Sequence, residues 1–196
     1  DIFSSAGIKS PDISVLSDVF LDEVKGMEQK NLAVELLKKL LNDEIKSRAK
    51  KNLVQSKSFA EMLEKAIIKY QNRTIEAAQI IEEMIQMAKD LRAADRRGEN
   101  LGLSEDELAF YDALEVNDSA VKVLGDEILK KIAHELVDTV KKNATIDWSV
   151  RESARARMRV MVKRILRKYG YPPDKQEQAT FTVIEQAELI CEGFAA

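Results

Sequence analysis

Apolar residues return every three or four positions along most of the chain, which is the spacing of an amphipathic α-helix. No segment alternates apolar and polar residues as a half-buried strand does, and no Asn-Gly or Asp-Gly pair indicates a hairpin turn. We therefore predict an all-α fold, a bundle of about eight amphipathic helices joined by short loops. The expected helices cover residues 11–26, 28–51, 58–71, 74–98, 104–114, 118–143, 148–170 and 172–191.

The expected helix starts carry capping signals. A hydroxyl side chain accepts a hydrogen bond from a free backbone N–H of the first turn. Ser58 with Glu61, and Ser104 with Glu107, have the spacing of a capping box, in which each side chain satisfies a backbone N–H near the other residue. The other predicted starts are marked by Ser10 before Pro11, by Thr74, by Asn117 or Asp118, by Asp147, and by Pro172 with Pro173.

Glycines mark the expected helix ends. Gly26, Gly98 and Gly170 each follow a periodic apolar run, so we expect the helices to stop there. Gly125 lies inside such a run, and we expect it to weaken the helix without ending it.

The domain organisation follows from the same pattern. Residues 11–196 form the helical domain, either as one bundle or as two lobes, 11–98 and 99–196. The chain opens on Asp1 with DIFSSAGIKSPD, which is typical of the middle of a protein. We therefore expect a fragment of a longer protein, with residues 1–10 as a linker from upstream domains.

Composition excludes several classes of protein. Apolar residues make up 45% and charged residues 33% of the chain, and the net charge of −3 gives no reason to expect the chain as a whole to bind DNA or membranes. The single Cys191 excludes a disulfide framework and fits a reducing compartment. No apolar run has the length of a membrane span. We expect a cytoplasmic protein.

Motifs for catalysis and cofactor binding are missing from the sequence. It contains no phosphate-binding loop, no HExxH and no cysteine pair, so we expect no catalytic residue and no cofactor. His134 has no second imidazole nearby and is expected on a helix surface. Pro11-Asp12 and Glu23-Val24-Lys25 spell the PD…ExK pattern of metal-dependent nucleases. Because Asp12 and Glu23 fall about 16 Å apart on one predicted helix, we interpret the match as a coincidence.

The segment LGLSEDELAFYDAL, residues 101–114, gathers four carboxylates around a Phe-Tyr pair. Carboxylates in a first turn are favoured by the helix dipole, so a capped amphipathic helix accounts for them without a catalytic role. We expect Leu108, Phe110 and Tyr111 on its buried side. The preceding RRGEN is predicted to be a loop, and its Arg96 and Arg97 are candidate partner contacts.

The strongest charge asymmetry lies in the stretch 149–170, which has eight Lys or Arg residues and one acid, Glu152. Five of the cations recur every four residues and form a basic ridge: Arg151, Arg155, Arg159, Lys163 and Arg167. Like charges at this spacing repel. Acidic neighbouring helices or an anionic partner, either phosphate backbone or an acidic protein surface, would each relieve that repulsion.

Three stretches in this order resemble the C-terminal helical region of the R (restriction) subunit of type I restriction-modification enzymes. They are PDISVLSDVFLDEVKGMEQKNLAVELLKKLLNDEI, LRAADRRGENLGLSEDELAFYDAL and WSVRESARARMRVMVKRILRKYGYPPDKQEQA. The resemblance implies a bacterial or archaeal parent, an ATP- and Mg-dependent DNA translocase and site-specific deoxyribonuclease, whose nuclease and motor motifs do not occur in this chain.

The resemblance also implies a role for the chain. We expect a non-catalytic assembly domain that docks the R subunit onto the methyltransferase and specificity subunits, through the basic ridge and the two RRGEN arginines. The alternative is a non-specific duplex DNA-binding module beside the motor domains. A third hypothesis is a brace for those motor domains in cis.

Overall fold

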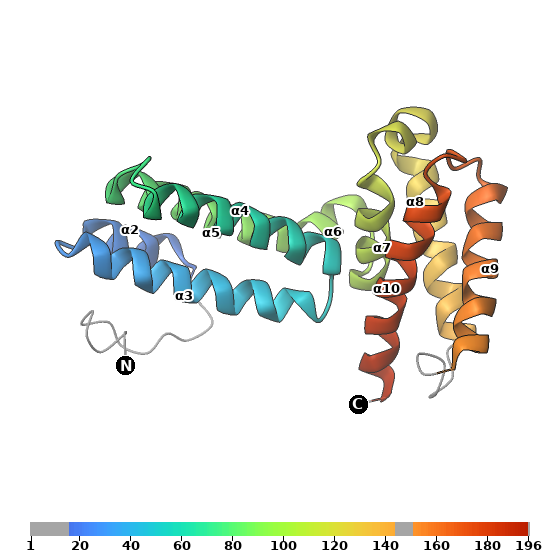
Figure 1. Ribbon diagram of the computed structural model, residues 1–196. Helices are drawn as coiled ribbons and strands as arrows, with labels where there is room; N and C mark the ends of the chain where they lie inside the picture. The colour runs from blue at the N-terminus through green and yellow to red at the C-terminus, as the bar shows by residue number, and fades with distance from the viewer. Residues whose placement is uncertain (1–15, 144–150, 196) are drawn as a thin grey trace. The chain divides into compact units, whose positions relative to one another are not determined.

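The computed structural model describes residues 16–143 and 151–195, and the regular structure in this part of the chain is entirely helical (Figure 1). The all-α prediction is therefore confirmed. The helices are α2 (Asp18–Gly26), α3 (Lys30–Ala49), α4 (Leu53–Gln71), α5 (Ala77–Asp95), α6 (Arg97–Leu101), α7 (Glu105–Glu115), α8 (Asp118–Asn143), α9 (Glu152–Lys168) and α10 (Gln176–Ala195).

The chain divides into two compact units. Among the described residues, unit 1 comprises 16–49 and 56–97, and unit 2 comprises 50–55, 98–143 and 151–195. Each unit buries its own cluster of apolar side chains.

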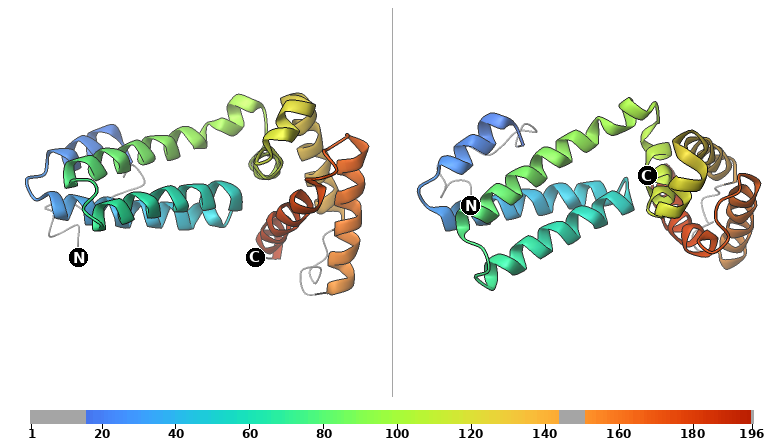
Figure 2. Two further views of the ribbon diagram at one scale, coloured as in Figure 1. Left: turned by 45° about the horizontal axis from the view of Figure 1, so that its top comes forward. Right: turned by 90° about the horizontal axis from the view of Figure 1, so that it is seen from above.

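Unit 1 is built on the pair α3 and α5, with α2 packed against both helices (Figure 2). The apolar stripes of the two helices meet through fully buried side chains, among them Leu36 and Leu37 of α3 and Met84 and Leu91 of α5. Burying each such side chain contributes about 1.5–3 kcal/mol. Helix α4 is different. It has the same length as α5, yet it buries three residues where α5 buries seven.

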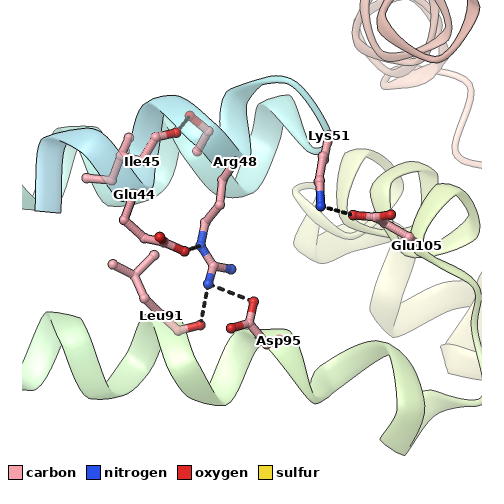
Figure 3. Close-up of polar contacts among 8 residues, drawn as sticks. Glu44, Ile45, Arg48, Lys51, Leu91, Asp95 and Glu105 are labelled. Carbon is pink, nitrogen blue, oxygen red and sulfur yellow. Dashed lines mark hydrogen bonds and ion pairs between the residues drawn. The ribbon is translucent and has the colours of Figure 1, made fainter. Parts of the chain in front are cut away.

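A buried arginine joins the ends of α3 and α5 (Figure 3). Arg48 is 8% exposed, and its Nη2 donates to the carbonyl oxygen of Leu91 at 2.8 Å and to Asp95 Oδ1 at 2.7 Å. Its Nε donates to Glu44 Oε1 at 3.1 Å. A buried guanidinium needs such partners because an unpaired charge away from water is costly.

Unit 2 is centred on α7, against which α8 and α10 pack, and α9 lies against α8 and α10 (Figures 1 and 2). All seven residues from Leu108 to Leu114 are buried. The expected burial of Leu108, Phe110 and Tyr111 is confirmed. Tyr171 is also buried, and its hydroxyl donates to the carbonyl oxygen of Leu114 at 2.9 Å.

The turn between α3 and α4 belongs to unit 2, and buried polar groups hold it there. Gln186 of α10 accepts from the backbone N–H of Leu53 at 3.0 Å and donates to the carbonyl of Lys51 at 2.8 Å. Asn52 Nδ2 donates to the buried Asp112 at 2.7 Å. The Lys51–Glu105 ion pair adds a surface contact at 3.3 Å (Figure 3).

The start predicted at Ser10 and Pro11 lies outside the described residues. Helix α2 begins at Asp18 after Ser17, whose hydroxyl accepts from the Phe20 N–H, so the predicted helix 11–26 is not continuous. The start predicted at Ser58 is wrong. The third helix begins at Leu53, because Asn52 Oδ1 accepts the N–H of Gln55 at 3.1 Å and acts as the cap. Ser58 is an exposed residue within that helix.

The starts of α5 and α10 also differ from the prediction. Thr74 does not cap α5, since the N-cap is Glu76 and the Thr74 N–H instead donates to the carbonyl of Lys69 at the end of α4. The last helix begins at Gln176, because residues 172–175, which include the two prolines, form a turn in which the Lys175 N–H donates to the Pro172 carbonyl. Residues 147–150 of the predicted seventh helix lie outside the described residues.

Two glycines behave differently from the prediction. Gly98 does not end a helix: α5 stops at Asp95, and Gly98 lies buried inside the short α6. A Cβ at Gly98 would come within 3.2 Å of the Leu103 carbonyl oxygen, which explains why glycine fits there. Gly125 does interrupt α8, because its φ of 74° and ψ of 167° are open only to glycine. Gly26 and Gly170 end their helices as expected.

Candidate functional site

The basic helix α9 has a well-defined local structure. Its apolar side, Met158, Val162, Ile165 and Leu166, is buried. The helix ends where Gly170 takes a φ of 75°, which lets the N–H of Tyr171 bond to the carbonyl of Leu166 at 2.9 Å. This is the Schellman pattern of a glycine-terminated helix. The remaining sides of α9 carry its cations.

Three cations of the basic ridge pair with acids of unit 2. Arg155 contacts Glu188 of α10 at 2.6 Å, and Lys163 contacts Glu177 of α10 at 2.8 Å. The Lys163 ammonium lowers the pKa of Glu177 through its hydrogen bond and its charge. Arg159 lies 3.7 Å from Glu152, which precedes it by about two helical turns on α9 itself. Acids of α9 and α10 therefore offset part of the like-charge repulsion along the ridge.

The outward side of α9 carries a different set of cations. Arg157, Arg164 and Arg167 are exposed, and none of them forms an ion pair within the described residues. Val160, which is 56% exposed, lies on the same side of the helix. We call these four residues the outward face. Only Arg167 belongs both to the predicted ridge and to the outward face. Arg151 is the exposed N-cap of α9.

The predicted RRGEN loop is helical, so that prediction is wrong. Arg96 is the exposed C-cap of α5, and Arg97 is the half-buried first residue of α6. Helix α6 ends at Leu101, after which Gly102 turns the chain with a φ of 69°. Both arginines belong to unit 1, whereas α9 belongs to unit 2.

The acidic segment 104–112 has structural partners. The Ser104–Glu107 capping box is confirmed, with the Glu107 N–H donating to Ser104 Oγ at 3.2 Å and the Ser104 N–H donating to Glu107 Oε1 at 3.4 Å. Asp106 lies 3.7 Å from Lys141. Asp112 is buried against Asn52. These contacts account for acids that the sequence places around the Phe-Tyr pair.

His134 lies exposed on α8, as predicted, and its Nδ1 is 3.2 Å from Glu107 Oε2. Partial burial opposes ionisation of Glu107, but hydrogen bonds from Ser104 and His134 outweigh it and lower its pKa. The two residues line an open cleft of about 530 Å³, together with Leu101, Gly102, Leu103, Glu127, Lys130, Lys131, Glu135, Asp138 and Tyr169. Both cations and acids line this cleft, and Glu135 accepts hydrogen bonds from both Tyr169 and Lys168.

The remaining candidate chemistry finds little support. Within residues 16–143 and 151–195, no three His, Cys, Asp or Glu side chains gather as metal ligands would. Pro11 and Asp12 of the PD…ExK pattern lie outside the described residues, and Lys25 of that pattern pairs with Glu82 at 2.8 Å. None of the helices in the described part is long and apolar enough to cross a membrane.

The buried polar residues that hold the α3–α4 turn were not predicted from the sequence: Asn52, Asp112 and Gln186. Asn52 carried a usable signal, since asparagine is a preferred N-cap and an apolar helical run follows it. Asp112 and Gln186 carried none, because their partners lie 60 and 133 residues away in the chain.

Comparisons with known proteins agree on one family. Residues 1–193 match the family model described as type I restriction enzyme HindI endonuclease subunit-like, C-terminal. The chain is 43% identical over 192 residues to the type I restriction enzyme HindI endonuclease subunit of Haemophilus influenzae, covering 98% of this chain and 18% of that protein.

A second relative is archaeal. The chain is 37% identical over 171 residues to the putative type I restriction enzyme MjaIXP endonuclease subunit of Methanocaldococcus jannaschii, covering 87% of this chain and 16% of the relative. The chain therefore spans less than a fifth of the length of either curated relative. No solved structure matches it.

Proposed function

Since the chain belongs to the family of C-terminal regions of type I restriction enzyme endonuclease subunits, we propose that it is a non-catalytic docking domain. It would hold the endonuclease subunit on the methyltransferase and specificity subunits of a restriction complex in the cytoplasm. The ATP- and Mg-dependent motor and the nuclease would lie in the rest of the parent protein. Docking would place that motor on DNA beside the recognition site.

The observation that carries the proposal is the outward face of α9. Three arginines, Arg157, Arg164 and Arg167, extend over about 15 Å of helix with no acid partner in the described residues. The exposed Val160 lies among them. Arginine around an apolar centre is typical of protein interfaces, whose cores are enriched in arginine and depleted of lysine. We therefore assign the main contact to the outward face, with the predicted ridge and RRGEN residues as further candidates.

The test is co-purification of the chain with the methyltransferase and specificity subunits. Changing Arg157, Arg164 and Arg167 to glutamine removes three charges without touching the buried side of α9. We expect affinity to fall at least about tenfold, which corresponds to 1.4 kcal/mol. The matched control changes three exposed lysines of other helices, Lys46, Lys57 and Lys89, to glutamine. Equal binding by both variants would refute the assignment of the outward face.

The same arginines also support the second candidate function, duplex DNA binding, because unpaired cations neutralise phosphates. If each of the three contacted a phosphate, the negative slope of log affinity against log salt would be less steep by about 2.7 in the glutamine variant. The apolar Val160 at the centre of the face favours protein over phosphate. Absence of duplex binding at low salt would eliminate this alternative.

A further inference from the structure

Helix α4 carries more apolar surface than unit 1 covers. Its buried residues are Ser56, Leu63 and Ala66. Met62 is 40% exposed on the side of α4 that carries Leu63 and Ala66, and Ile68 is 46% exposed away from that side. Phe59, Ile67 and Tyr70 are only partly buried. A helix with an apolar stripe of this kind normally buries it against a neighbour.

A groove of about 300 Å³ runs between α4 and α5 on one side of that stripe. Its apolar lining is Met62, Ala66 and Met87. Methionine side chains are flexible and polarisable, so they adapt to the shape of a bound apolar side chain. The lining extends over residues 62–69 of α4 and 83–90 of α5, or about 10 Å along each helix. This length fits about two turns of a bound helix.

The two rims of the groove have opposite charge. Lys65 and Lys69 line the α4 side, and Glu83 and Asp90 line the α5 side. Within the described residues these lysines form no ion pair with the facing acids, although Asp90 accepts a hydrogen bond from Gln86. A helix lying between the rims would meet cations on one flank and anions on the other.

We propose that this groove binds an amphipathic helix of a partner protein, with acidic residues on the flank that faces α4 and basic residues on the flank that faces α5. Duplex DNA does not fit, because Glu83 and Asp90 repel phosphate and the floor is apolar. The groove lies in unit 1 and the outward face in unit 2, so this proposal is independent of the docking role of α9.

The probe is a helical peptide of about 16 residues, long enough to populate a helix. It has leucines along one face, glutamates on one flank and lysines on the other. Two comparison peptides carry lysine on both flanks or glutamate on both flanks. A peptide with the flanks exchanged is no control, because it binds in the reverse direction. By calorimetry we expect the mixed peptide to bind about tenfold more tightly than either comparison peptide, from several ion pairs of a few tenths of a kcal/mol each.

Variants of the chain test the same idea. The double change Lys65→Glu with Lys69→Glu makes both rims acidic and should shift the preference to the all-lysine peptide. Lys46→Glu with Lys57→Glu, outside the groove, should not. Met62→Glu should abolish binding, whereas Ile68→Glu, an equally exposed position outside the lining, should not. Circular dichroism checks that each variant stays helical.

Three results would overturn the proposal. The first is no binding of any peptide at about 1 mM, where the binding free energy is only about 4 kcal/mol. The second is an unchanged peptide preference after charge reversal at Lys65 and Lys69. The third is a concentration-dependent dimer that Met62→Glu dissociates, because the occupant would then be a second copy of the chain.

Discussion

Replacing Arg48 with methionine should lower the free energy of unfolding of unit 1 by about 2 kcal/mol. The magnitude follows from the contacts of the guanidinium. Its hydrogen bond to the carbonyl of Leu91 is buried, and a hydrogen bond to a charged group contributes about 1.5–3 kcal/mol. The carboxylates of Glu44 and Asp95 are 37% and 61% exposed, so both regain water when the arginine is lost and add little. Methionine keeps most of the aliphatic packing.

The assay is amide hydrogen exchange of α3 and α5, because the two units of the chain need not unfold in one transition. A loss of 2 kcal/mol raises the exchange of the protected amides about 30-fold. Arg48→Lys keeps the charge but loses the planar fork, and should be intermediate. Lys46→Met is the matched control, an exposed residue in the same last turn of α3, and should change stability by less than about 0.5 kcal/mol. If the protected amides of α3 and α5 exchange at the same rate in Arg48→Met and Lys46→Met, the buried arginine does not stabilise unit 1.

Three further predictions concern unit 2. Gly125→Ala should destabilise unit 2 by about 1–3 kcal/mol in urea unfolding, because the backbone of an alanine is strained at a φ of 74° and a ψ of 167°. Ser104→Ala should cost about 1 kcal/mol through loss of the capping box, read as faster exchange at the start of α7. A hydrogen bond from Tyr169 lowers the pKa of Glu135; Lys168 adds to this effect and partial burial opposes it. The ionised Glu135 therefore stabilises the fold fully above its unfolded pKa of about 4.3. This stabilisation is lost as pH falls through the lower folded pKa. In Glu135→Gln, the free energy of unfolding should decrease less at acid pH, as measured by unfolding curves at a series of pH values.

Local sequence patterns specify the helices and several of their ends. Amphipathic spacing, the Ser104–Glu107 capping box and the stop at Gly170 depend on residues within a few positions of one another, and all three were confirmed. The absence of known catalytic motifs was equally visible in the residues. Local errors arose where two signals competed: Ser58 has a capping-box partner, but Asn52 caps the helix because Asp112 holds its side chain in place.

The pairing of the charges depends on tertiary packing. The ridge cations recur every four residues in the sequence, but Arg155 and Lys163 pair with Glu188 and Glu177, which lie on α10 after the turn at Gly170. Which cations stay without an acid partner depends on that antiparallel packing and not on spacing along α9. The α4–α5 groove is hidden from the sequence for the same reason. An apolar stripe predicts a buried face, and only the packing shows how much of that stripe remains uncovered.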